Sequence, residues 1–313
     1  MIDDLEQLIA RAVAEGYGDI YELTEVADDA PEDLAPYLPR LLAADVVYPG
    51  KLYRAADSEV QRGLVAKADT CCQDDADDEL RLNHLLVALA QTRGPVAEAA
   101  FRRWRDQPPP GADQLHIGPA DYMREGGWML EGDDVRELGG PVSYGLEAED
   151  GPEHSERERC RGCGGPVWTA LDLDTADERV AEALAHVGWS GRLRPAFCYG
   201  CAAAADTLFI EVRPDGTSRL TDPPEPSTDA PMLEAPTVRM VLGDRSGRRP
   251  VGSAVGGQAV WMDDAAYPDC PKCRKPMASI AQIDMQDLTH HVGYHTFFLH
   301  TECHLAAMVT QWE

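Results

Sequence analysis

Residues 270–273 read Cys-Pro-Lys-Cys and residues 300–303 read His-Thr-Glu-Cys, with 26 residues between the two tetrapeptides. This stretch decides the fold. Two metal ligands two residues apart can share one tight turn, called a knuckle, and two knuckles supply the four ligands of a tetrahedral structural zinc site. An earlier copy has Cys-Arg-Gly-Cys at residues 160–163, a gap of 34 residues, and Cys-Tyr-Gly-Cys at residues 198–201. We therefore expect two zinc ions per chain, bound by Cys160, Cys163, Cys198 and Cys201 in the first copy and by Cys270, Cys273, His300 and Cys303 in the second.

The two copies match beyond their ligands. Each has a Gly-Gly pair before its first knuckle, a proline three residues after it, and an apolar, strand-like stretch next. Each second knuckle then lies between two further strand-like stretches. This matched order predicts an internal duplication rather than two unrelated zinc ribbons. The matched segments are 139–140 and 256–257, Pro166 and Pro276, 167–174 and 277–284, 194–197 and 294–299, and 207–212 and 306–312.

The second copy resembles a known family. The resemblance is carried by Val-Gly-Gly at 255–257 with Trp261, by Tyr-Pro-Asp-Cys-Pro-Lys-Cys-Arg-Lys-Pro-Met at 267–277, and by Gln-Ile-Asp at 282–284, followed by an aromatic strand. This order is similar to that of the bacterial YwqG family and of eukaryotic programmed cell death protein 2, and it covers about residues 136–313. The chain departs from the family pattern at three positions. Ala259 stands where the family usually has Pro or Asp, Tyr144 stands where it has a tryptophan, and His300 replaces a knuckle cysteine.

The resemblance implies two paired units and a protein-binding role without catalysis. The eukaryotic relatives are thought to act as chaperones of a ribosomal protein, and some bacterial relatives lie in toxin–immunity neighbourhoods.

Composition restricts the function. The 313 residues carry a formal net charge of −27, which repels nucleic-acid phosphate and attracts a basic partner, or serves only to keep the protein soluble. No apolar stretch is long enough to cross a membrane, and the acidic N-terminal sequence has no secretory signal, so we expect a cytoplasmic protein. Nine cysteines in that setting favour metal binding over disulfides and leave Cys71 and Cys72 without a predicted role.

The chain is expected to be α+β, with a helical N-terminal domain followed by a duplicated zinc-ribbon β module. Apolar periodicity predicts helices near residues 2–13, 34–43, 80–90 and 96–105. The predicted domains are a HEAT-like stack or helical bundle over 1–110, a first zinc-ribbon unit over 111–213, a proline-rich linker over 214–250 and a second zinc-ribbon unit over 251–313.

A zinc deaminase is the strongest enzyme alternative. His-Thr-Glu at 300–302 matches its H-x-E element, but here the Cys-x-x-Cys pair comes before that element instead of after it. Cys303 also supplies a fourth protein ligand, which leaves no position for a reactive water. His304 stays an alternative to His300 as ligand.

We therefore expect a non-enzymatic zinc protein that binds a basic protein partner as a chaperone or adaptor. The first alternative is an immunity protein that neutralises a toxin. A zinc-dependent hydrolase or deaminase is the less favoured alternative.

Overall fold

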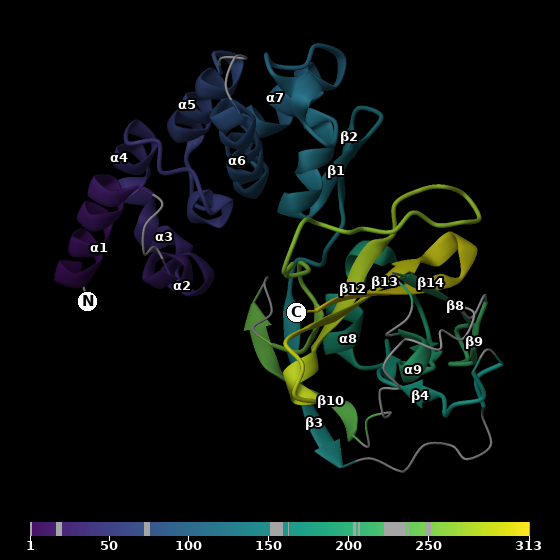
Figure 1. The fold of residues 1–313 in the computed structure, drawn as a ribbon. Coiled ribbons are helices and arrows are strands. Elements are labelled where there is room, and N and C mark those ends of the chain that lie inside the picture. Colours follow the sequence, from purple (N-terminus) through teal and green to yellow (C-terminus); the bar gives the residue numbers. More distant parts are fainter. Residues whose placement is uncertain are drawn as a thin grey trace. The chain divides into compact units, whose positions relative to one another are not determined.

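The computed structural model describes residues 2–16, 21–71, 76–150, 159–161, 163–202, 205, 207–221, 236, 238–247 and 252–312. The chain divides into two compact units, Met1–Arg136 and Glu137–Glu313. The first is helical and the second is rich in strands, which confirms the α+β class (Figure 1). Among the described helices, none has the length and apolar character that crossing a membrane requires.

The first unit extends further along the chain than the helical pattern predicts. Residues 111–136 were expected in the first zinc-ribbon unit, but they belong to the first compact unit, and their apolar side chains, Tyr122, Met123 and Trp128 among them, pack in the core of the helices. Trp128 is buried, packs edge-on against Phe101 and donates from Nε1 to the Ala90 carbonyl at 2.8 Å. The elements of this unit are α1 Ile2–Glu15, α2 Tyr21–Asp29, α3 Pro31–Leu34, η1 Ala35–Tyr37, α4 Leu38–Ala43, η2 Gly50–Tyr53, α5 Ser58–Asp69, α6 Ala76–Thr92, α7 Pro95–Asp106, η3 Ala112–Gln114, η4 Pro119–Gly126, β1 Trp128–Glu131 and β2 Asp134–Glu137.

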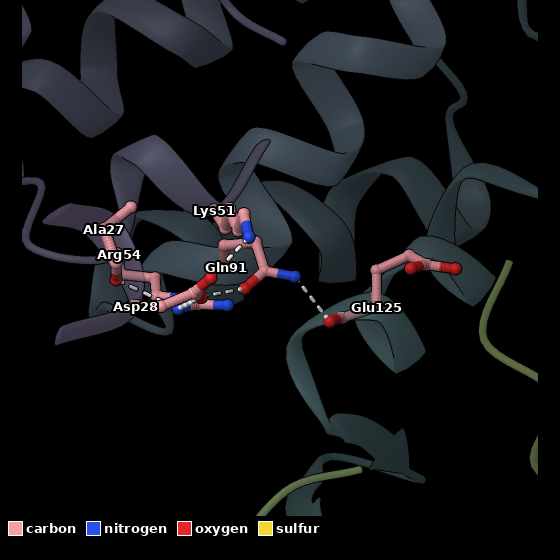
Figure 2. A network of polar contacts seen from close by, with 6 residues as sticks. All are labelled: Ala27, Asp28, Lys51, Arg54, Gln91 and Glu125. Carbon is pink, nitrogen blue, oxygen red and sulfur yellow. Dashed lines mark hydrogen bonds and ion pairs between the residues drawn. The ribbon is translucent and has the colours of Figure 1, made fainter. Parts of the chain in front are cut away.

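A polar network joins several helices of this unit (Figure 2). The Arg54 guanidinium donates to the Ala27 carbonyl at 3.0 Å and to Asp28 at 2.7 Å, so it binds the C-terminal end of α2. Gln91 of α6 accepts from Arg54 Nε at 3.4 Å and donates to the Glu125 carbonyl of η4 at 2.6 Å. These hydrogen bonds connect segments that lie far apart in the sequence.

The second unit is built on an eight-stranded antiparallel sheet in the order β10-β3-β11-β12-β13-β14-β8-β9. Two short two-stranded sheets, β4–β7 and β5–β6, are separate from this sheet. One apolar core contains residues of both copies, from Val142 to Met308. The elements are β3 Ser143–Asp150, β4 Trp168–Thr169, β5 Leu173–Asp174, α8 Glu178–Ala183, η5 Ala185–Val187, β6 Arg192–Leu193, β7 Ala196–Phe197, α9 Tyr199–Ala202, β8 Thr207–Val212, β9 Ser218–Leu220, β10 Val238–Gly247, β11 Ala254–Gly256, β12 Ala278–Asp284, η6 Met285–Asp287, β13 Gly293–His300, η7 Thr301–Cys303 and β14 Leu305–Trp312.

The strand register shows the duplication. In the first copy Trp168 pairs with Phe197, five residues after one knuckle and one residue before the other. In the second copy Ala278 pairs with Leu299 at the same two offsets. The last strands of the copies, β8 and β14, pair with each other, and so do the Gly-Gly segments, since Gly140 N–H donates to the Gly257 carbonyl at 2.7 Å. The copies therefore share one sheet.

The expected linker over 214–250 is partly strand. β9 and β10 fall within it and form the two edges of the main sheet. Its prolines at 223, 224, 226 and 231 lie outside the described residues.

Candidate metal centres

The structure brings the eight predicted ligands together in two groups of four. In each group the sulfur and nitrogen ligand atoms all lie within 4.8 Å of one another. The first group joins a turn at 160–163 to the short helix α9, and the second joins a turn at 270–273 to the end of β13 and η7. The groups are Cys160, Cys163, Cys198 and Cys201, and Cys270, Cys273, His300 and Cys303.

The first knuckle of each copy has the same backbone hydrogen bonds. Cys160 N–H donates to the Gly165 carbonyl at 2.8 Å, and Gly164 N–H donates back to the Cys160 carbonyl at 2.9 Å. In the second copy Cys270 N–H donates to the Lys275 carbonyl at 2.8 Å, and the backbone then turns through Arg274. Gly164 and Arg274 hold the same place and have φ of +73° and +64°. The tight turn therefore follows from the Cys-x-x-Cys spacing, and glycine is the residue that suits its left-handed position.

The spacing of the ligand atoms fits a tetrahedral metal ion. In the first group the sulfur–sulfur distances are 3.6 Å for Cys160–Cys201, 3.3 Å for Cys163–Cys198 and 3.6 Å for Cys163–Cys201. Zinc–sulfur bonds of about 2.3 Å at tetrahedral angles place sulfurs about 3.8 Å apart. These cysteines are not disulfide-bonded. The sites could therefore each hold one ion, two per chain.

His300 rather than His304 belongs to the second group. His300 is buried, and its Nε2 lies 3.3 Å from Cys273 Sγ. His304 is exposed, has φ of +48°, and its ring packs edge-on against Trp189 with 5.8 Å between centroids. The in-register histidine is thus the one placed to bind a metal.

The thiols of each group differ in acidity. Burial raises the pKa of Cys198 to about 11. Desolvation acts on Cys163 too, but hydrogen bonds, first that from the Gly165 N–H, outweigh it and lower the pKa of that thiol. In the second group, the backbone hydrogen bond from Lys275 lowers the pKa of Cys273, whereas desolvation raises the pKa of Cys303 to about 11. A divalent cation that binds here must displace protons from thiols whose pKa is raised, such as Cys198 and Cys303.

The remaining candidate residues, Cys71, Cys72 and Glu302, are not among the eight ligands. Cys71 is buried in the core of the helical unit, which fits a packing role, and Cys72 lies outside the described residues. Glu302 lies between His300 and Cys303 on η7 and is exposed.

Sequence reasoning missed a cavity of about 740 Å³ in the second unit, between β10 and the strands β4 and β5. Its only sequence signal was Trp168, an aromatic residue within an expected strand.

The comparisons with known proteins give a distant relative. The chain is 29% identical over 263 residues to YpfL, an uncharacterized protein of Salmonella typhimurium strain LT2. The match covers 75% of this chain and 58% of that protein, so the chain spans little more than half of the relative's length. No family profile matches the chain, and no solved structure matches it.

Proposed function

We propose that this chain is a non-enzymatic zinc protein that binds a basic protein partner as a chaperone or adaptor. The observation that carries the proposal is the completeness of both metal groups. Each offers four protein ligands, and a zinc ion that has four protein ligands keeps no open position for water or substrate. The metal then serves to hold the two knuckles of each copy together.

Zinc is the proposed metal. One group offers four thiolates and the other offers three thiolates and one imidazole, in tetrahedral spacing. Such ligands favour zinc over calcium or magnesium, which take oxygen ligands. Reduced thiolates of this kind suit a reducing compartment, and we place the protein in the cytoplasm.

The proposed partner is basic because the chain is acidic throughout. Residues 1–136 contain 28 acidic and 13 basic residues, and residues 137–313 contain 27 and 15. An excess of one sign raises the association rate with a partner of opposite charge and opposes binding to nucleic acid. The matched register of the two copies supports the duplication. The resemblance to the YwqG family and programmed cell death protein 2, which rests on the sequence, implies protein binding.

Affinity capture of partners at increasing salt tests the proposal. The charge-dependent gain in the association rate should shrink as salt rises, because the Debye length falls from about 10 Å at 0.1 M salt to about 3 Å at 1 M. We expect basic proteins in the captured fraction and fewer of them at high salt. Capture of a cationic toxin would specify the immunity role. Capture of nucleic acid, or turnover of a nucleotide or peptide by the purified protein, would contradict the proposal.

A further inference from the structure

The two copies differ at one strand edge. In the second copy, β12 pairs with β13 on one side and with β11 on the other, and β11 in turn pairs with β3. In the first copy, the corresponding edge consists of β4 and β5. Among the strands of the described residues, β4 pairs only with β7 and β5 only with β6. The first copy therefore has no described counterpart of β11 at this edge.

The 740 Å³ cavity lies along that edge. Its opposite wall is residues 238–242 of β10, an edge strand whose described pairing is with β3 alone. At one end Trp168 Nε1 donates to the Val238 carbonyl at 3.1 Å, and towards the other Arg179 donates to the Gly243 carbonyl at 3.4 Å. We call this space the edge groove. It lies between two strand edges, and these two side-chain hydrogen bonds, to the Val238 and Gly243 carbonyls of β10, mark its ends.

The floor of the edge groove is apolar. Trp168 packs edge-on against Phe197 and Tyr199, and Tyr199 stands between the first-copy ligands Cys198 and Cys201, so the metal centre supports this wall. The buried apolar side chains that line the groove are Leu146, Trp168, Ala170, Leu173, Val180 and Met240.

The rim of the edge groove is charged. Its arginines already lie against carboxylates: Arg192 and Arg194 against Asp172, and Arg239 against Glu149. Asp174 instead accepts the backbone N–H of Ala176 at 2.9 Å. Asp177, which also lines the groove, pairs with Arg179, so the rim carries three arginines and three aspartates and is balanced in charge. The preference for a cationic occupant therefore comes from the net charge of −27 of the whole chain.

We propose that the edge groove binds an extended segment of the partner, which adds as a strand between β10 and the β4–β5 edge. The segment has alternating apolar and basic residues, and its basic character rests on the proposed function. The five residues of β10 that line the groove span about 17 Å, enough for a strand of similar length. Backbone hydrogen bonds supply affinity, and alternate side chains enter the apolar floor. The second copy gives the precedent, since β11 fills the equivalent position with small, fully buried Ala254 and Val255.

The test uses the full, metal-loaded chain and a labelled eight-residue peptide of alternating valine and lysine, with binding followed by fluorescence anisotropy. Peptides with glutamate in place of lysine, and with a central proline, are the controls. Thr169→Trp places a large side chain at a half-buried lining position, and Thr221→Trp makes the same change next to the opposite sheet edge, β9. Val241→Trp, on the β10 wall, is the second blocking variant. Metal content and thermal unfolding establish that each variant is folded.

We expect the valine–lysine peptide to bind and to protect amides of residues 238–242 from hydrogen exchange. The two groove variants should each weaken binding at least tenfold, the β9 variant should leave it unchanged, and the proline peptide should not bind. The groove assignment is overturned if the peptide fails to bind, or if it binds all variants equally without protecting β10. If basic proteins are still captured in that case, the proposed function stands without the groove. Equal binding of the lysine and glutamate peptides would instead keep the groove and remove the basic preference.

Discussion

One residue in the first knuckle of each copy has a left-handed backbone, and the copies fill this position differently. The first copy uses Gly164 and the second uses Arg274, although the surrounding hydrogen bonds are the same. A side chain in this conformation costs about 1–2 kcal/mol. The ligand spacing, which is local, was enough to predict both knuckles and all eight residues of the two groups. It left His304 open as an alternative to His300, because the choice depends on the direction of the chain after β13.

Gly164→Ala should lower the free energy of unfolding of the second unit by about 1 kcal/mol. A Cβ at this position meets no atom within 4 Å, so the effect is conformational rather than steric. Arg274→Ala is the matched control and should have little effect, because a side chain is already present there. Thermal unfolding of the zinc-loaded variants measures both. Equal effects of the two changes would contradict this reading of the knuckle.

The buried His295 should make stability depend on pH. Burial lowers the pKa of its imidazole from 6.5 to about 4. Between these values the unfolded chain binds a proton that the folded chain does not, so stability falls as pH falls, by up to about 3 kcal/mol across the window. Urea unfolding of the wild type and of His295→Gln should show a difference that shrinks towards pH 4, while acid release of metal affects both proteins alike. Parallel pH curves would contradict the lowered pKa of this imidazole.

At the scale of elements, the local sequence pattern predicted where helices and strands lie better than it predicted whether each one is unbroken. The strand over 207–212 and the helices near 2–13, 80–90 and 96–105 form close to where apolar periodicity places them. The helix expected over 34–43 is instead divided among the end of α3, η1 and α4, because Pro36 and Pro39 lack the N–H that a continuous helix needs. The strand expected over 167–174 is interrupted between β4 and β5. β10 was missed because its pairing partner, β3, is distant in sequence.

Arg54 should be important for the stability of the helical unit. Its side chain is only 12% exposed and binds the C-terminal end of α2 through Ala27 and Asp28. Arg54→Met removes the donor to the Ala27 carbonyl and one of the two donors to Asp28, which keeps Lys51, and should cost about 1–3 kcal/mol of stability. Arg54→Lys should recover only part of the loss, because an ammonium lacks the planar guanidinium that serves Ala27, Asp28 and Gln91 together. Thermal unfolding followed by helical circular dichroism checks this, and an unchanged Arg54→Met protein would contradict it.

At the scale of the whole molecule, the two copies depend on each other more than two separate ribbons would. They share one sheet through β8 and β14 and one apolar core. The sequence predicted the duplication but not this joint sheet, because strand pairing between copies leaves no local signal. Loss of either metal group should therefore disturb both copies, while the helical unit keeps its own core.

Removal of metal should destabilise the second unit and leave the stability of the helical unit unchanged. A strong chelator should expose the amides of β8 and β14 to hydrogen exchange and leave those of α5, α6 and α7 protected, because metal binding and folding of the second unit are coupled. The wild type kept in excess zinc is the control. Loss of protection in the helices at the same chelator concentration would mean that the two units unfold as one.

Native mass spectrometry of the purified chain tests the central claim most directly. We expect two zinc ions on the wild type and on His304→Ala, and loss of zinc from the affected site in Cys198→Ser and in His300→Ala. A wild-type chain that carries one metal ion or none, or a His300→Ala chain that keeps both ions while His304→Ala loses one, would contradict it.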